Sequence, residues 1–270
     1  MRNKLLPGLS VSFSFASWNI NSTRQRETLV LDWLSNHPVD VLCLQEIKCE
    51  QHQFPASFAE AGYHVAIVGQ KAYNGVAVIA RKPFEVRHRR LPGFSHDAAR
   101  YIEIEIDRLT IGGLYLPNGN SGGEEGYRLK IEFFETLAHH AREMLERDED
   151  FALIGDFNVC PAPEDLAPGA LGAHDALLRP ETRAAWRSLC WLGLTDAVRA
   201  LHPRERLYTF WDYQAGAWDR NMGLRIDHAL LSPRLADRLE AVHIDRDERA
   251  RPQPSDHVPL VVTLRADRPL

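Results

Sequence analysis

The sequence predicts an α/β (α+β) sandwich, and three observations support this fold class. Short apolar runs with the length of β-strands recur along the chain. Segments with the spacing of amphipathic helices lie between several of these runs. Hydrophobic residues make up 44% and charged residues 26% of the 270 positions, an ordinary globular composition that excludes collagen, coiled-coil and disordered architectures. Because no linker or repeat divides the chain, we expect one domain over residues 1–270, with residues 1–10 as a flexible extension.

At the start of the chain, two strands are expected to enclose a helix. Residues 11–20 and 39–44 are apolar runs that predict strands. Between them, Ser22 and Gln25 have the spacing of a capping box, an apolar face follows, and Pro38 ends the helix.

The middle of the chain predicts four further strands and one long helix. The strand-like runs are 64–68, 75–80, 101–106 and 109–116. The helix is predicted over 127–145, where apolar residues recur at intervals of three and four: Tyr127, Ile131, Phe134, Ala138, Ala141 and Leu145.

The last part of the chain again alternates strands and helices. A strand is predicted at 151–155, and a loop rich in Pro, Gly and Ala runs from about 160 to 180. A helix at 181–192 follows, with Pro180 at its start and Gly193 beyond its end. The remaining strands are predicted at 207–211, 226–232 and 258–264.

Charge and hydropathy exclude two classes of protein. The net charge of −5 excludes a surface that is basic throughout, although a local basic patch for nucleic acid remains compatible with it. The longest apolar runs, such as 76–80, are far shorter than the ~18 residues that a membrane span requires. We therefore expect no membrane association.

The cysteines and the N-terminus bear on the cellular compartment. Arg2 and Lys4 precede a mildly apolar segment ending at Ser17, which faintly resembles a signal peptide. Cleavage there would remove the first core strand, so we reject export. The cysteines are scattered without a Cys-x-x-Cys pair, which favours reduced thiols in a cytoplasmic protein; they are Cys43, Cys49, Cys160 and Cys190.

Several predicted strands end in polar residues that a hydrophobic core does not require. Carboxylates, amides and one histidine occur in WNIN (18–21), LQE (44–46), YLPN (115–118), GDFN (155–158), RID (225–227) and SDH (255–257). Polar groups held at strand ends by a packed sheet commonly form functional sites. Together they predict a hard-cation site for phosphate chemistry.

With LQE-x-K, NGVAV and GLRID in the same order, these segments closely resemble the exonuclease III family of DNA repair nucleases. That family belongs to the wider endonuclease/exonuclease/phosphatase superfamily, which includes deoxyribonuclease I. The resemblance extends from Ser17 to Leu264. It implies a four-layer sandwich, in which two mixed β-sheets lie face to face with helices outside and the active site lies at one edge.

The resemblance implies a Mg²⁺ site, at which Mn²⁺ substitutes. Mg²⁺ prefers oxygen ligands and keeps several waters, so few carboxylates suffice. Glu46 is the expected first ligand, with Asp256 and Asn21 as further contributors. Asn21 stands where some relatives have an aspartate, which leaves open whether one or two metal ions bind.

The resemblance also implies catalytic roles for six residues, one of which is Tyr115 in YLPN. Asp156 orients or deprotonates the attacking water, and Asn158 positions Asp156 or a phosphate oxygen. Asp227 orients His257 and favours its cation, which stabilises charge on the phosphate. Asn19 holds this network together or contacts phosphate.

Further residues are expected to bind the DNA backbone. Tyr115 and Asn118 are expected to donate hydrogen bonds to phosphate oxygens. Backbone contacts are implied, by position in the family, for Lys48, Tyr73, Asn74 and Arg100. The segment 81–90 carries five basic residues and one acid. It is either an extension of the DNA track or a solvated hairpin edge.

The substrate pocket departs from the family pattern. Its apolar wall is expected from Phe210, Trp211 and Leu224. His174 stands roughly where relatives often have a small residue and is expected to narrow the pocket. The loop 160–178 has no Lys or Arg, and 119–123 lacks the Arg that some relatives insert into the duplex.

These features predict a Mg²⁺-dependent DNA repair nuclease that acts as a monomer on double-stranded DNA. We expect it to hydrolyse phosphodiester and phosphomonoester bonds at damaged or recessed 3′ ends in preference to incising 5′ to abasic sites. The alternative is a dedicated abasic-site endonuclease with weak exonuclease activity. More remote alternatives are a phosphodiesterase acting on substrates other than DNA and an inactive DNA-binding module.

Overall fold

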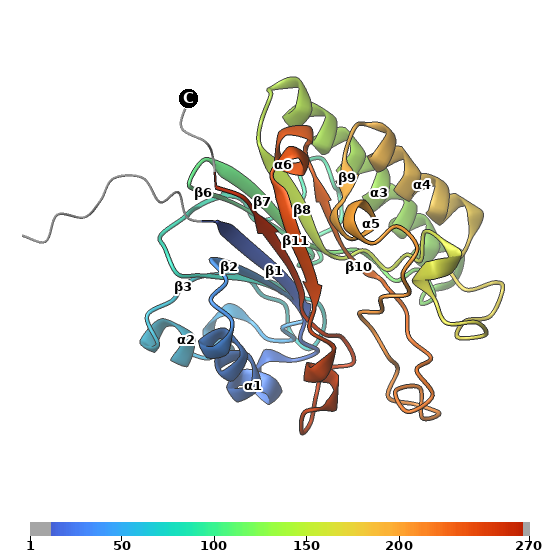
Figure 1. Cartoon of the computed structure of the whole chain (residues 1–270), viewed down its shortest axis with the longest axis horizontal. Helices are drawn as coiled ribbons and strands as arrows, with labels where there is room; N and C mark the ends of the chain where they lie inside the picture. Colours follow the sequence, from blue (N-terminus) through green and yellow to red (C-terminus); the bar gives the residue numbers. More distant parts are fainter. Residues whose placement is uncertain (1–11, 267–270) are drawn as a thin grey trace, which may run out of the picture.

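The computed structural model describes residues 12–266, so the expected extension over residues 1–10 lies outside the described part of the chain. Two six-stranded sheets lie face to face (Figure 1). Sheet A, in the order β11-β12-β1-β2-β4-β3, contains β1 (Phe13–Asn19), β2 (Val41–Gln45), β3 (His64–Val68), β4 (Val76–Ala80), β11 (Leu239–Ile244) and β12 (Leu260–Leu264). Sheet B, in the order β5-β6-β7-β8-β10-β9, contains β5 (Glu85–His88), β6 (Tyr101–Ile106), β7 (Leu109–Tyr115), β8 (Phe151–Asp156), β9 (Thr195–Asp196) and β10 (Asp227–Leu231).

Helices cover the outer face of each sheet (Figure 1). Sheet A carries α1 (Thr23–Asn36) and α2 (Ser57–Glu60), and sheet B carries α3 (Gly123–Glu146) and α4 (Pro180–Trp191). Two short helices, α5 (Ala197–Leu201) and α6 (Pro233–Asp237), flank β10. Separate apolar clusters fill the space between the sheets, beneath α1 and beneath α3 and α4. The predicted four-layer sandwich is therefore confirmed. No helix within residues 12–266 has the length and apolarity to span a bilayer.

The topology brings the polar strand ends together at one edge. In sheet B, β7 and β8 are parallel and β10 is antiparallel to β8, so Tyr115, Asp156 and Asp227 lie in register on neighbouring strands. In sheet A, β1 and β2 are parallel and pair Asn19 with Gln45, the residue before Glu46. Because β1 also contacts β8 across the interface between the sheets, both sets of strand ends face the same edge.

Three predicted details of the fold are wrong. Residues 207–211 form no strand; Phe210 makes only isolated bridges, to Leu224 and His257. The edge strands β5, β9 and β11 were not predicted: β5 and β11 have charged, partly exposed sequences without apolar runs, and β9 has only two residues. The Ser22 side chain makes no capping hydrogen bond, since its φ of 88° places it in a left-handed turn between β1 and α1.

The buried face of α3 lies beside the predicted one. Ile131 and Ala138 are only partly buried, and the helix instead buries Lys130 and His140 together with its aromatic residues. Apolar periodicity assigns lysine and histidine to the surface, so the predicted buried face is rotated from the observed one.

Candidate active site

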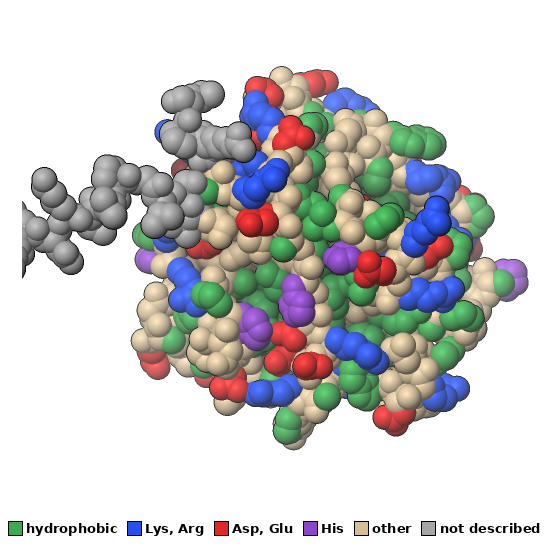
Figure 2. All heavy atoms as spheres, viewed as in Figure 1, with side chains coloured by type: hydrophobic (Ala, Val, Ile, Leu, Met, Phe, Trp, Pro, Cys, Tyr) green, Lys and Arg blue, Asp and Glu red, His purple; other side chains and the backbone are tan. Residues whose placement is uncertain are grey.

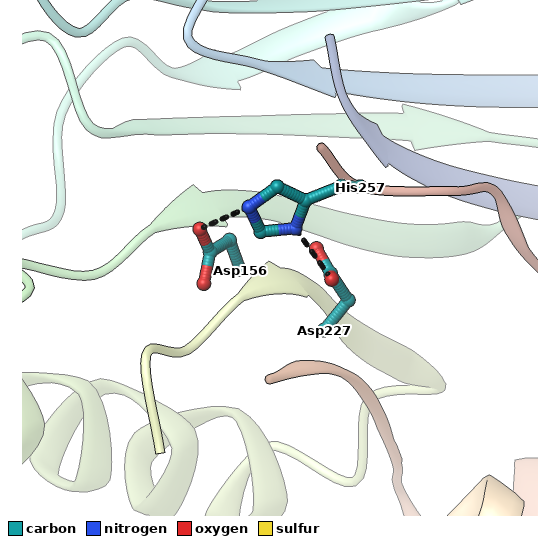
Figure 3. Close-up of side chains that lie close together, drawn as sticks. All are labelled: Asp156, Asp227 and His257. Atoms are coloured by element: carbon teal, nitrogen blue, oxygen red, sulfur yellow. Dashed lines mark hydrogen bonds and ion pairs between the residues drawn. The ribbon is translucent and has the colours of Figure 1, made fainter. Parts of the chain in front are cut away.

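His257 lies between two buried aspartates at the edge of the sandwich (Figure 3). Its Nδ1 lies 2.8 Å from Asp227 Oδ2, and its Nε2 lies 3.7 Å from Asp156 Oδ2. Burial opposes protonation of His257, but the charge of Asp227 and the hydrogen bond to it, reinforced by Asp156, raise the histidine pKa to about 10. With this pKa the ring is a cation at neutral pH.

Asp156 is nearly inaccessible and accepts several hydrogen bonds. Its oxygens accept from Asn19 Nδ2 at 3.0 Å and from the backbone N–H of Asn158 at 2.9 Å. Burial raises the pKa of Asp156 to about 7, supported by the charges of Asp227 and Glu46 and opposed by His257. A carboxylate with a pKa near neutrality can take a proton from water at physiological pH.

Asn19 connects Asp156 to a second group of oxygens. The same Nδ2 donates to Glu46 Oε1 at 3.0 Å, and Glu46 Oε2 lies 2.9 Å from Lys48 Nζ. Lys48 also donates to Asn21 Oδ1 at 2.6 Å, and Asn21 Nδ2 donates to Asp256 Oδ1 at 3.1 Å. The ammonium of Lys48 thus lies where oxygens of Glu46 and Asn21 converge.

The electrostatics and backbone of this oxygen group favour a cation. Burial opposes ionisation of Glu46, but the Lys48 charge and the hydrogen bonds from Asn19 and Lys48 outweigh it and lower the Glu46 pKa. Glu46, Lys48 and Asn21 have left-handed φ angles of 50°, 52° and 46°. Such conformations cost about 1–3 kcal/mol per residue, persist only where the surrounding structure fixes them, and cluster at functional sites. A donor set of two carboxylates and an amide oxygen matches what Mg²⁺ prefers.

Two asparagines and a tyrosine complete the polar wall. Asn118 Nδ2 donates to Asn158 Oδ1 at 3.0 Å, and Asn158 Nδ2 donates to the carbonyl of Leu116 at 2.9 Å. The guanidinium of Arg100 lies 4.7 Å from the ring centre of Tyr115. Burial, together with the charges of Glu46 and Asp156, raises the pKa of Tyr115 well above its usual range. The phenol therefore stays protonated and can donate a hydrogen bond.

Part of this group lines one cavity of about 290 Å³. Its predicted lining residues are Glu46, Tyr115, Asn118, Asp156, Asn158, Phe210, Leu224, Asp256 and His257. Sequence reasoning missed the rest of the wall, which comprises Asn120, Leu171, Asp175, Leu177, Asp212 and Ile226. Most of these residues come from loops, where no periodicity marks the residues that face inward.

Two predicted pocket residues do not line this cavity. Trp211 is buried elsewhere, packed edge-on against Tyr208 and Trp218, because successive residues of an extended segment point to opposite sides and Phe210 takes the inward side. His174 is exposed, and its neighbour Asp175 faces the cavity instead.

The predicted backbone-binding residues surround the site at varying exposure. Tyr73 is 72% exposed, which leaves its ring free to contact a ligand. Asn74 is partly buried and donates to Gln70 at 3.0 Å, and Arg100 donates to the carbonyl of Tyr115 at 3.1 Å.

The basic segment 81–90 includes the edge strand β5 of sheet B. Three of its basic residues form ion pairs with acids outside the segment, namely Arg87–Glu149, Lys82–Asp107 and Arg90–Asp97. Because these cations already have acidic partners, the segment is better described as a solvated hairpin edge than as an extension of the DNA-binding surface. Figure 2 shows basic and acidic side chains interspersed over the face in view, in keeping with the net charge of −5.

The loop 160–180 is fixed by a buried ion-pair network. Arg225, which is fully buried, donates to Asp165 at 2.6 Å and to Asp196 at 2.9 Å. The loop also docks on Asn120, whose Oδ1 accepts from the N–H of Ala176 at 2.8 Å. The cavity wall formed by this loop is therefore held by specific contacts.

Comparison with known proteins agrees with this geometry. Residues 16–257 match the model of the Endonuclease/Exonuclease/phosphatase family. Exodeoxyribonuclease III of Haemophilus influenzae is 34% identical over 260 residues, covering 91% of this chain and 97% of its own. The structure of an AP endonuclease from Archaeoglobus fulgidus superposes with a TM-score of 0.88 at 35% identity, over 93% of this chain and 99% of that one. The 3′ phosphatase NExo from Neisseria, solved bound to a product DNA hairpin, gives a TM-score of 0.88 at 33% identity, over 94% and 99% of the two chains. The chain belongs to the endonuclease/exonuclease/phosphatase family.

Proposed function

We propose that this protein is a Mg²⁺-dependent DNA repair nuclease that hydrolyses phosphate ester bonds at DNA 3′ ends. The observation that carries the proposal is the buried His257 ring between Asp156 and Asp227, with Glu46 and Asp256 lining the same cavity and Asn21 bonded to Asp256. The similarity to an exodeoxyribonuclease III and to a 3′ phosphatase over more than 90% of the chain supports it.

The metal would be held by Glu46, with Asp256 and Asn21 as further oxygen ligands. Lys48 Nζ already contacts Glu46 and Asn21 in this oxygen set, which supports the fit of a cation there. When bound, the ion supplies positive charge that neutralises the phosphate and stabilises the leaving oxygen.

The residues of the chain orient the water and the phosphate. Asp156 accepts a proton from the attacking water, and Asn19 fixes one of its oxygens by a hydrogen bond. The Nε2–H of His257 donates to a phosphate oxygen, and Asp227 maintains the charge and orientation of the ring. Asn118, Asn158 and the Tyr115 hydroxyl are further donors toward the phosphate.

The substrate preference follows from the loops around the cavity. The segments 119–123 and 160–178 contain no Lys or Arg, and Asp175 and Asp212 add carboxylates to the cavity wall. Incision inside a duplex requires distorting the DNA and extruding a sugar, at a cost of a few kcal/mol that loop contacts must offset. A 3′ end is already frayed and needs less deformation. We therefore infer that 3′-phosphate removal and 3′–5′ exonuclease activity exceed abasic-site incision.

A second candidate function is abasic-site endonuclease activity as the main reaction. Phe210 and Leu224 form an apolar side of the cavity that an extruded abasic sugar could contact. The similarity to the AP endonuclease of Archaeoglobus fulgidus favours the same candidate.

The site is assembled within one chain, which supports a monomeric single-domain enzyme. The backbone of double-stranded DNA would contact Lys48, Tyr73, Asn74 and Arg100 around the cavity mouth. All four cysteines are free thiols, which supports placement in a reducing compartment such as the cytoplasm.

The proposed function is tested with four labelled duplexes: intact, 3′-recessed, 3′-phosphorylated and abasic. We expect processing of the 3′ ends with Mg²⁺ or Mn²⁺ and none with EDTA. Glu46→Ala should lose activity at least a hundredfold, because it removes the main metal ligand. Full activity of Glu46→Ala in EDTA would contradict the proposal.

A further inference from the structure

Lys130 is a fully buried lysine on α3 that none of the roles above uses. Its Nζ donates to the backbone carbonyl of Asn118 at 2.8 Å and to that of Asn158 at 2.5 Å. One amino group therefore bridges the loop after β7 and the loop after β8. These are the two loops whose asparagine side chains face the cavity.

Both carbonyls belong to turns with unusual backbone conformations. Asn158 has a φ of 49°, and Gly119, directly after Asn118, has a φ of 86°. A Cβ on Gly119 would come within 2.7 Å of Lys130 Cδ, so the lysine stem packs directly against this turn. Nζ thus fixes the backbone from which each asparagine side chain projects.

The asparagine side chains depend on each other as well as on Lys130. Asn118 Nδ2 donates to Asn158 Oδ1, and the N–H of Asn158 donates to Asp156 Oδ1. A shift of either loop would turn an asparagine amide away from the phosphate and disturb the hydrogen bond to Asp156. A displacement of about 1 Å at such groups can reduce turnover about a hundredfold.

The charge of Lys130 is not neutralised by a direct partner among residues 12–266. None of their carboxylates lies within 4 Å of its Nζ, and the acidic groups that act on it from a distance are Asp156, Asp175 and the thiol of Cys160. Burial lowers the Lys130 pKa to about 7. A buried amino group without a carboxylate partner is costly in the core, and packing alone does not explain its presence there.

We propose that Lys130 is a positioning residue of the phosphate site, whose amino group holds the carbonyls of Asn118 and Asn158 and thereby aims their side-chain amides at the scissile phosphate. This inference rests on the proposed function. It assigns to a helix on the outer layer a direct part in aligning the active-site loops. Lys130 itself touches no substrate.

The test compares kcat and KM for 3′-phosphate removal by Lys130→Met and Lys130→Gln with those of the wild type. Methionine keeps the volume of the stem and removes the donors, whereas glutamine keeps an N–H donor without the charge. We expect Lys130→Met to lower kcat about ten- to a hundredfold with a smaller change in KM, and Lys130→Gln to recover part of the loss. Tyr127→Phe, on the same helix as Lys130, is the matched control: it removes a buried hydrogen bond to Thr182 of α4 but no contact to either loop, and it should retain kcat within about twofold.

A double-mutant cycle distinguishes positioning from general stabilisation. Because Lys130 acts through Asn118 as well as Asn158, Lys130→Met should cost at least about threefold less in kcat when Asn118 is already alanine. Thermal unfolding gives the folded fraction of each variant.

Two outcomes would overturn this inference while leaving the proposed function intact. In the first, the wild type is active and Lys130→Met has the same kcat after correction for its folded fraction. In the second, the kcat loss of the double variant equals the product of the losses of Lys130→Met and Asn118→Ala. A wild type without activity on any DNA duplex would instead overturn the proposed function, and this inference with it.

Discussion

The strand-end cluster and the loops that wall the cavity are built in different ways. In the cluster, Asn19, Asp156 and Asp227 are buried at strand ends, with Asp156 and Asp227 in register on β8 and β10, and His257 in the loop before β12 is bonded to Asp227. The wall formed by 118–121 and 160–180 depends on side-chain contacts such as those of Asn120 and Arg225. The cluster contains groups for bond cleavage, whereas the wall has acids and apolar side chains, and its segments 118–121 and 160–178 contain no Lys or Arg.

This difference separates the chemistry from the choice of substrate. A sheet edge fixes side chains with little freedom, so it suits groups whose alignment decides the rate. Loops tolerate substitution more readily, and they decide which DNA structure reaches the cluster. Variants of the cluster should therefore affect all substrates alike, and variants of the wall should change the ratio between substrates.

The largest effect is expected for the cluster itself. Asp156→Asn and His257→Ala should each lower kcat at least about a hundredfold on every substrate, with smaller losses of DNA affinity, because both groups act on charge that develops in the transition state. Single-turnover rates and equilibrium binding, measured separately, check this. Losses confined to affinity would assign both residues to positioning alone.

A smaller effect is expected on the free energy of unfolding, because burial of the Asp156 carboxyl disfavours its ionised form. Burial raises the Asp156 pKa to about 7, so between about pH 4 and 7 the native state binds a proton that the unfolded chain has released. The contribution of Asp156 to stability therefore falls as pH rises through this range. In EDTA, the unfolding free energy of Asp156→Asn relative to wild type should increase from pH 4 to pH 7, on the order of 3 kcal/mol. Denaturant titrations at both pH values measure it, and a constant difference would contradict the assigned shift.

The smallest effect is expected for single residues of the wall. Asp175→Asn removes a carboxylate from the cavity and should raise abasic-site incision relative to 3′-phosphate removal several-fold, because it reduces repulsion of the DNA strand. His174→Gly should leave the ratio within about twofold, since that side chain is exposed and does not line the cavity. The ratio of kcat/KM on the two duplexes checks both. If His174→Gly changes this ratio strongly and Asp175→Asn does not, then His174 is the residue that narrows the pocket.

The strand-end residues could be predicted from sequence, because each motif joins an apolar run to a polar residue. Glu46 after β2 and Asp156 at the end of β8 are examples, and parallel pairing then brings such ends together. Asp175 and Asp212 could not be predicted, because loops carry no periodicity that marks an inward side chain. Burial of Lys130 could not be predicted even though it lies on a strongly periodic helix. A lysine in a helix is assigned to solvent unless tertiary contacts are known. Trp211 shows that adjacency to Phe210 in sequence does not place two side chains on one side.

The most direct test of the account measures kcat/KM of the wild type on 3′-phosphorylated, 3′-recessed and abasic duplexes of the same sequence, at one Mg²⁺ concentration. We expect at least one 3′-end reaction to exceed abasic incision by about tenfold or more, and Asp156→Asn to lower all three reactions by a similar factor. A wild type that prefers the abasic duplex would contradict the role given to the loops. Unequal losses in Asp156→Asn would contradict the separation of chemistry from substrate choice.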